Sequence, residues 1–396
     1  MIEGMSVRKS RRGEVEPFYA MELMKFANIK SAEGADVISL CLGQPSDGAP
    51  DPVLEAAARA LASGSALGYT DASGLPELRE QIASHYLAYY GVEVDPERVQ
   101  VTTGSSAGFT AVILAAFDAG DEVVMTRPGY PAYRNVLAAH GCHVVEIDCG
   151  PESGFQPTIE MLEALPVAPA GLVVASPSNP TGTIIAPEQL AAIAAWCEDH
   201  GTLLISDEIY HGISFGAPTA SVLQSSQNHV AVGSFSKYYC MTGWRIGWLI
   251  VPDELARRVE LLLGNLNLST PTLSQIAAIE AFSAEAKPEL DAHVAKYRRN
   301  RDLVLDRLPD LGVTGFVVPD GAFYVYPDIS HLTDDSLAWC LKVLDETAVT
   351  LTPGIDFAPV IAGRTSTTDG SRFIRISTAG ASEEIEEAFD RLVAWV

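Results

Sequence analysis

The chain has 396 residues, 47% of them apolar and 19% charged, which allows two buried cores and argues against long disorder. Its 26 Lys and Arg against 51 Asp and Glu give a formal charge of −25, which does not suit a nucleic-acid partner. No stretch approaches the ~20 apolar residues of a membrane span. A signal peptide requires an apolar run after its basic segment, and none follows Arg8–Arg12. The six cysteines form no C-x-x-C pair and have no His cluster beside them, which predicts no metal site and fits a reducing cytoplasm.

The first half of the chain predicts one helix and then an alternation of strands and helices. Phe18, Met21 and Met24 lie at helical spacing within Phe18–Ile29, and we expect this helix to pack against the smaller of two domains. Short β-branched runs then alternate with longer Ala- and Leu-rich segments such as 104–119 and 187–200. The expected strands are Glu122–Thr126, His143–Ile147, Leu172–Ala175, Leu203–Ser206, Val230–Val232 and Ile246–Val251. This alternation predicts an α/β fold whose large domain has a mainly parallel sheet sandwiched by helices.

From about Ser283 onward the pattern changes to that of a smaller α+β domain. The expected elements are a polar helix at Lys287–Arg307, short strands at Gly315–Val318 and Ala322–Tyr326, a helix near Asp335–Thr347, a strand at Arg372–Ile376 and a final helix at Ser382–Trp395. We therefore expect a large domain over residues 48–285 and a small domain built from residues 1–47 and 286–396.

Polar motifs follow several of these strands, where α/β folds bind their ligands. They are Thr102–Gly108, Ser176–Gly182, Ser206–Tyr210 and Ser234–Lys237, the last followed by Gly243-Trp244-Arg245. Each motif alone is more often a turn, a helix cap or a solvated lysine. Together the motifs supply four groups in one chain. These are a helix N-terminus that can hold a phosphate, a side-chain amide, a carboxylate and an amine. Burial and nearby cations make such an amine nucleophilic, and Arg245 can grip a phosphate with two nitrogens.

The set of motifs resembles the class I/II (fold type I) pyridoxal-phosphate (PLP) aminotransferases of the aspartate/aromatic kind, over nearly the whole chain. The matching signatures are Ser-Asn-Pro-Thr-Gly at 178–182, Asp-Glu-Ile-Tyr at 207–210, Ser-Phe-Ser-Lys at 234–237 with Gly-Trp-Arg at 243–245, and Phe-Ile-Arg-Ile-Ser at 373–377. The resemblance implies a PLP-dependent transaminase that moves an amino group from an L-amino acid to a 2-oxo acid by a ping-pong mechanism.

The resemblance also implies a role for each matched residue. Lys237 forms the internal aldimine and acts as acid and base, Asp207 partners the pyridine nitrogen, and Asn179 and Tyr210 donate to the cofactor's O3′. Ser105, Ser106, Ser234 and Arg245 form the phosphate cup, with Ser236 nearby, and Tyr130 stacks on the ring. Arg375 binds the substrate α-carboxylate, which the backbone of Gly43 faces. Tyr69 reaches the phosphate of the neighbouring subunit, so a homodimer with shared active sites is expected.

The substrate is less well encoded than the chemistry. Some bacterial aspartate-type members have a lysine where this chain has Ser106, and that lysine helps to bind the distal carboxylate of the substrate. Its absence here argues against a strict aspartate preference. We therefore expect a donor with a neutral or aromatic side chain, and 2-oxoglutarate or pyruvate as acceptor. A PLP-dependent C–S lyase on the same scaffold stays open as an alternative. A PLP-sensing transcription regulator is disfavoured, because only about forty residues precede Gly43, too few for a DNA-binding domain and linker.

Overall fold

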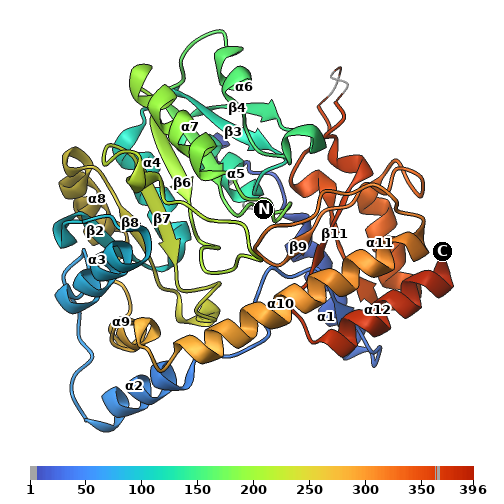
Figure 1. The fold of residues 1–396 in the computed structure, drawn as a ribbon, viewed down its shortest axis with the longest axis horizontal. Coiled ribbons are helices and arrows are strands. Elements are labelled where there is room, and N and C mark those ends of the chain that lie inside the picture. Colours follow the sequence, from blue (N-terminus) through green and yellow to red (C-terminus); the bar gives the residue numbers. More distant parts are fainter. Residues whose placement is uncertain (1–6, 362, 364–365) are drawn as a thin grey trace, which may run out of the picture.

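The protein is represented by a computed structural model that describes residues 7–361, 363 and 366–396 (Figure 1). Its larger part is built on a seven-stranded sheet with the order β2-β8-β7-β6-β5-β3-β4. The strands are β2 (Val99–Thr102), β3 (Glu122–Arg127), β4 (His143–Asp148), β5 (Gly171–Ala175), β6 (Leu203–Asp207), β7 (Val230–Ser234) and β8 (Gly247–Ile250). Only β8 runs antiparallel to its neighbours within this sheet. The predicted, mainly parallel α/β sheet is therefore confirmed.

Helices cover both faces of this sheet. They are α2 (Asp51–Ala62), α3 (Pro76–Tyr90), α4 (Gly104–Ala116), α5 (Pro131–His140), α6 (Ile159–Glu163), α7 (Pro187–Asp199), α8 (Asp253–Leu266) and α9 (Thr272–Ile279). Successive residues of a strand point to opposite faces. In β3, Val123 and Met125 pack with α4, α5 and α8, whereas Val124 packs with α3, α7 and α9. The strands are apolar on both faces for this reason.

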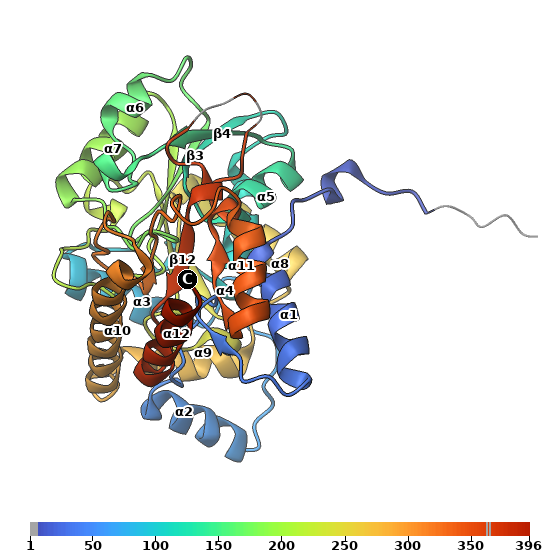
Figure 2. The ribbon, with the colours of Figure 1, turned by 90° about the vertical axis from the view of Figure 1, so that its right-hand side faces the viewer.

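The C-terminal part forms a second core together with the N-terminal helix. Its elements are α1 (Tyr19–Ala32), β1 (Ile38–Ser39), α10 (Lys287–Arg307), β9 (Tyr324–Val325), α11 (Ser336–Thr347), β10 (Val349–Thr350), β11 (Thr352–Pro353), β12 (Ile374–Ser377) and α12 (Ser382–Trp395). One apolar cluster joins Leu23 of α1 to residues of α10, α11 and α12. In Figure 1, α10 runs from the corner near α2 and α9 to this second core, and Figure 2 shows α1 beside α11. The packing predicted for the N-terminal helix is confirmed.

One detail of the prediction is wrong. The segment 315–318 is not a strand and pairs with no other strand of the described residues, and its Val318 is exposed. In α1, Ala20, Leu23 and Ala27 are buried, and Phe18 and Met24 of the predicted set pack beside them, whereas Met21 is half exposed. Among the helices of the described residues, none is both long and apolar enough to cross a membrane.

Candidate active site

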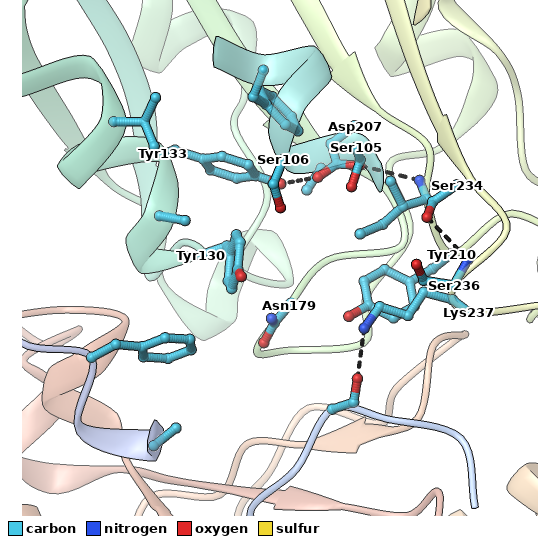
Figure 3. Close-up of a pocket in the computed structure, with 18 of the residues that line it drawn as sticks. Ser105, Ser106, Tyr130, Tyr133, Asn179, Asp207, Tyr210, Ser234, Ser236 and Lys237 are labelled. Carbon is cyan, nitrogen blue, oxygen red and sulfur yellow. Dashed lines mark hydrogen bonds between the residues drawn. The ribbon is translucent and has the colours of Figure 1, made fainter. Parts of the chain in front are cut away.

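The predicted site residues meet in one cavity of about 480 Å³ between the two cores (Figure 3). Because β2, β5, β6 and β7 are mutually parallel, their carboxyl ends lie at one edge of the sheet, and each is followed by one of the polar motifs. The cavity is lined by Gly43, Ser105, Ser106, Tyr130, Asn179, Asp207, Tyr210, Ser234, Ser236, Lys237, Arg245 and Arg375. Eleven of the twelve residues assigned by resemblance as site residues, together with Ser236, are thus brought together.

At one end of the cavity, a helix N-terminus faces a cation. Helix α4 begins at Gly104 directly after β2. The N–H groups of its first turn, which have no partner within the helix, therefore lie at the carboxyl end of this strand. A Cβ on Gly104 would lie 2.4 Å from Nη2 of Arg245, which shows how closely the guanidinium approaches this helix end. Arg245 itself has a left-handed backbone, with φ of +54°, which is a strained conformation for a residue with a side chain. The arrangement forms a cradle for an anion.

Lys237 points its amine toward the second core. Nζ donates a hydrogen bond of 2.6 Å to the carbonyl oxygen of Gly43, the contact drawn in Figure 3. Burial lowers the pKa of Lys237 to about 8, and the positive charges of Arg375 and Arg245 act in the same direction. Near pH 8, half of the molecules therefore carry the neutral, nucleophilic amine.

Asp207 is the last residue of β6 and lies almost fully buried at the base of the cavity. Its carboxylate accepts hydrogen bonds from the hydroxyl of Tyr133 and, at 3.2 Å, from the N–H of Ile209. Burial raises the pKa of Asp207 to about 6, although both hydrogen bonds and the charge of Lys237 oppose the shift. A carboxylate in this position is stabilised when a positive charge is bound beside it.

Arg375 lies on β12, opposite the sheet, and connects three elements. Its Nη1 donates to Oδ1 of Asn179 at 2.8 Å, and its Nη2 donates to the carbonyl of Cys41 and to Oγ1 of Thr352. The guanidinium lies over the ring of Tyr324, 4.5 Å from the ring centre. Arg375 is thereby held rigidly, as a residue that orients a carboxylate must be.

Tyr133 and Tyr324 were not identified from the sequence. Tyr324 lines the cavity next to Gly43, where its hydroxyl leaves no space for a Cβ on the glycine. Tyr133 lies in the first turn of α5, and its ring meets that of Tyr130, the N-cap residue of this helix, at a centroid distance of 5.4 Å. Tyr69 is the predicted residue outside the cavity, and 82% of its surface is exposed.

Comparisons with known proteins agree with this geometry. Residues 35–392 match the family model described as aminotransferase class I and II. The chain is 51% identical over 394 residues to a valine–pyruvate aminotransferase from Mycobacterium tuberculosis, covering 99% of both chains. It is 34% identical to an aspartate/prephenate aminotransferase from Thermus thermophilus, covering 91% of both. A crystal structure of an aminotransferase from M. tuberculosis superposes with a TM-score of 0.94 at 51% identity, covering 98% of this chain and 99% of that one.

Proposed function

The chain belongs to the class I and II aminotransferases, a PLP-dependent family, and we propose that it transfers the amino group of a neutral, aliphatic L-amino acid to a short 2-oxo acid such as pyruvate. The observation that carries the donor class is the set of cations in the cavity. Lys237, Arg245 and Arg375 are the only Lys or Arg side chains among the described lining residues. Each has a part in holding the cofactor or the α-carboxylate, so this chain offers no further cation for a second, distal carboxylate.

The cavity fits PLP in size and chemistry. Its volume is that of a typical cofactor pocket. The cradle between Gly104 and Arg245, with the hydroxyls of Ser105, Ser106 and Ser234, suits the phosphate. The buried carboxylate of Asp207 suits a protonated ring nitrogen, and Lys237 lines the same cavity. When bound, PLP supplies an electron sink for the negative charge that develops at the substrate Cα.

The protein's own residues would then divide the work of the reaction. Arg375 binds the α-carboxylate with two nitrogens and fixes which bond at Cα stands perpendicular to the cofactor ring. Nζ of Lys237, neutral at mildly alkaline pH, would take the proton from the substrate Cα and return it at the end of the transfer. Asp207 would keep the ring nitrogen protonated, Tyr210 and Asn179 would donate to the ring oxygen, and Tyr130 would pack against the ring.

The similarity to the valine–pyruvate enzyme supports this donor and acceptor. The apolar lining residues Phe18, Met21 and Leu42 also suit an aliphatic side chain. Steady-state kinetics with a panel of donors and acceptors tests the proposal. We expect kcat/KM for valine with pyruvate to exceed that for aspartate with 2-oxoglutarate by ~10-fold or more, the value of one missing charge-assisted contact. A preference for aspartate would refute the donor class. Release of ammonia and pyruvate from a β-substituted amino acid, without amino transfer, would support the lyase instead.

We further propose a homodimer in which Tyr69 enters the partner's cavity. The support is the number of exposed apolar side chains on α2, in the segment that follows it and just after α8, namely Leu54, Leu61, Leu67, Tyr69 and Leu268. Figure 1 shows α2 at the outer corner of the molecule. Exposed apolar side chains are covered where they lie in a subunit interface. Leu61→Asp should convert the dimer to a monomer in sedimentation experiments and abolish activity, whereas a wild-type protein that sediments as an active monomer would contradict the proposal.

Two broader expectations also stay proposals. Residues 48–285 and residues 1–47 with 286–396 would form the two domains, supported by the separate apolar clusters of the sheet and of α1 with α10–α12; the first six residues lie outside the described part. Limited proteolysis that releases a stable fragment by cleavage near residue 286 would support this division into domains.

Six free cysteines support a reducing location such as the cytoplasm. Cell fractionation tests this location.

A further inference from the structure

The N-terminal segment forms one wall of the cavity. Phe18, Ala20 and Met21 line it, together with Leu42 from the same part of the chain. The ring of Phe18 meets that of Tyr130 edge to face, with centroids 6.0 Å apart. These side chains are apolar, so they are suited to contact the aliphatic side chain of a donor whose α-carboxylate is on Arg375.

The position of this wall depends on the start of α1, which has no cap of its own. Phe18 occupies the N-cap position and its side chain makes no capping hydrogen bond. The carboxylate of Asp356 caps the helix instead, because Oδ1 accepts from the N–H of Tyr19 at 2.7 Å and Oδ2 from that of Ala20 at 2.8 Å. The cap thus comes from a residue more than 330 positions away in the sequence.

Asp356 is itself fixed by its surroundings. It ends the short 3-10 helix Gly354–Asp356, which follows β11, and it is only 2% exposed. Its carbonyl oxygen accepts from Nη2 of Arg134 on α5 at 3.2 Å, and Nη1 of Arg134 is paired with Glu146 on β4 at 2.8 Å. The residue therefore connects the C-terminal core, the sheet domain and the lining segment at one point.

We propose that Asp356 is a specificity-determining positioning residue: its carboxylate caps α1 from across the fold and so holds Phe18 and Met21 against the side chain of the amino donor. The inference rests on the proposed aliphatic donor. Asp356 does not line the cavity and so does not itself contact substrate. Loss of the cap should therefore affect how well the donor side chain is bound, and leave the cofactor and the α-carboxylate site in place.

Hydrogen exchange on the PLP-loaded enzyme without substrate tests the cap directly. In Asp356→Asn, the amide nitrogen of the side chain would face one backbone N–H, so only one of the two hydrogen bonds can re-form. We expect exchange of the α1 amides to become ~5-fold faster, the effect of one lost hydrogen bond. Asp335→Asn is the control, because both N–H groups that cap α11 donate to one oxygen, Oδ1 of Asp335, which an amide oxygen can replace, so exchange in α11 should not change. Unchanged exchange in α1 of the Asp356 variant would overturn the proposal.

Kinetics with two donors test the consequence for specificity. Asp356→Asn should lower kcat/KM for valine ~5-fold, mainly through KM, but change that for alanine, which has one methyl group, by less than ~2-fold. Phe18→Ala should discriminate in the same way, and the double variant should be no worse than Phe18→Ala, because both act through one contact. Equal losses for both donors, or additive effects, would overturn the proposal. A wild-type enzyme that rejects valine would refute the donor class, and the exchange measurement distinguishes that failure from failure of the cap.

Discussion

The hydroxyl groups of Tyr210 and Tyr324 lie 2.7 Å apart in the buried part of the cavity. Tyr324 also packs its ring against the guanidinium of Arg375. One side chain therefore contacts both the residue proposed to donate to the cofactor oxygen and the residue proposed to bind the α-carboxylate. When Tyr210 donates to the cofactor, its oxygen is left as the acceptor for the Tyr324 hydroxyl, which polarises Tyr210 as a donor.

The Tyr324→Phe variant should keep its fold and its stacking on Arg375 but lose this hydrogen bond. We expect kcat/KM to fall by ~5- to 10-fold, since a net hydrogen bond contributes about 1 kcal/mol. The matched control is Tyr326→Phe, because Tyr326 is also buried but its hydroxyl donates to the carbonyl of Gly354, away from the cavity lining. Equal kinetics in the two variants would show that the contact with Tyr210 has no role in the reaction.

The rate of covalent PLP attachment to the apoenzyme should depend on pH through Lys237. The neutral amine is the reactive form and its pKa is about 8, so the rate should fall about tenfold per pH unit below this value and level off above it. Arg375→Met removes a cation that lowers the pKa and should move the midpoint to higher pH. Stopped-flow absorbance measures both, and a midpoint near 10 in the wild type would contradict the burial argument.

Asp207→Asn should separate stability from activity. In the apoenzyme, burial raises the pKa of Asp207 to about 6, above its unfolded value near 4, so the folded state disfavours the ionised carboxylate. This penalty is absent below pH 4, develops between pH 4 and 6, and is complete above pH 6. The asparagine apoenzyme should therefore be more stable than wild type by about 3 kcal/mol at pH 8 and equally stable at pH 4, as measured by urea unfolding.

The same variant should lose at least ~100-fold in kcat when loaded with PLP, because an amide cannot stabilise a positive ring nitrogen as a carboxylate does. A gain in apoenzyme stability without this loss of activity would mean that Asp207 does not face the ring nitrogen. A variant that is less stable as apoenzyme and also inactive when loaded with PLP would point to a merely structural role for the carboxylate.

Adding a cation at Ser106 should redirect the enzyme toward dicarboxylic substrates. Ser106 is exposed to the cavity in the first turn of α4, so a longer side chain has space there. In Ser106→Lys we expect the ratio of kcat/KM for aspartate to that for valine to rise ~10-fold, the value of a charge-assisted hydrogen bond. Ser106→Met is the control for chain length. An equal rise in both variants would show that charge is not what the cavity lacks.

The sequence predicted the sheet, and it pointed to most of the residues that meet in the cavity, because both depend on local patterns. Buried parallel strands are apolar runs, and each polar motif follows such a run directly, as Asp207 follows Leu203–Ser206. The contacts of Tyr324 and Asp356 were not predictable in this way. Tyr324 meets Tyr210 from 114 positions away and Asp356 caps α1 from across the fold, and neither contact has a spacing that one sequence can reveal.

The half-reaction with L-valine tests the central claim most directly. Purified enzyme loaded with PLP is mixed with valine in the absence of any 2-oxo acid, and the visible absorption of the bound cofactor is followed while the released 2-oxo acid is quantified. The account predicts loss of the band with one equivalent of 2-oxoisovalerate per active site, its return when pyruvate is added, and neither event in Lys237→Ala. An unchanged band with valine, together with a full conversion by aspartate, would contradict it.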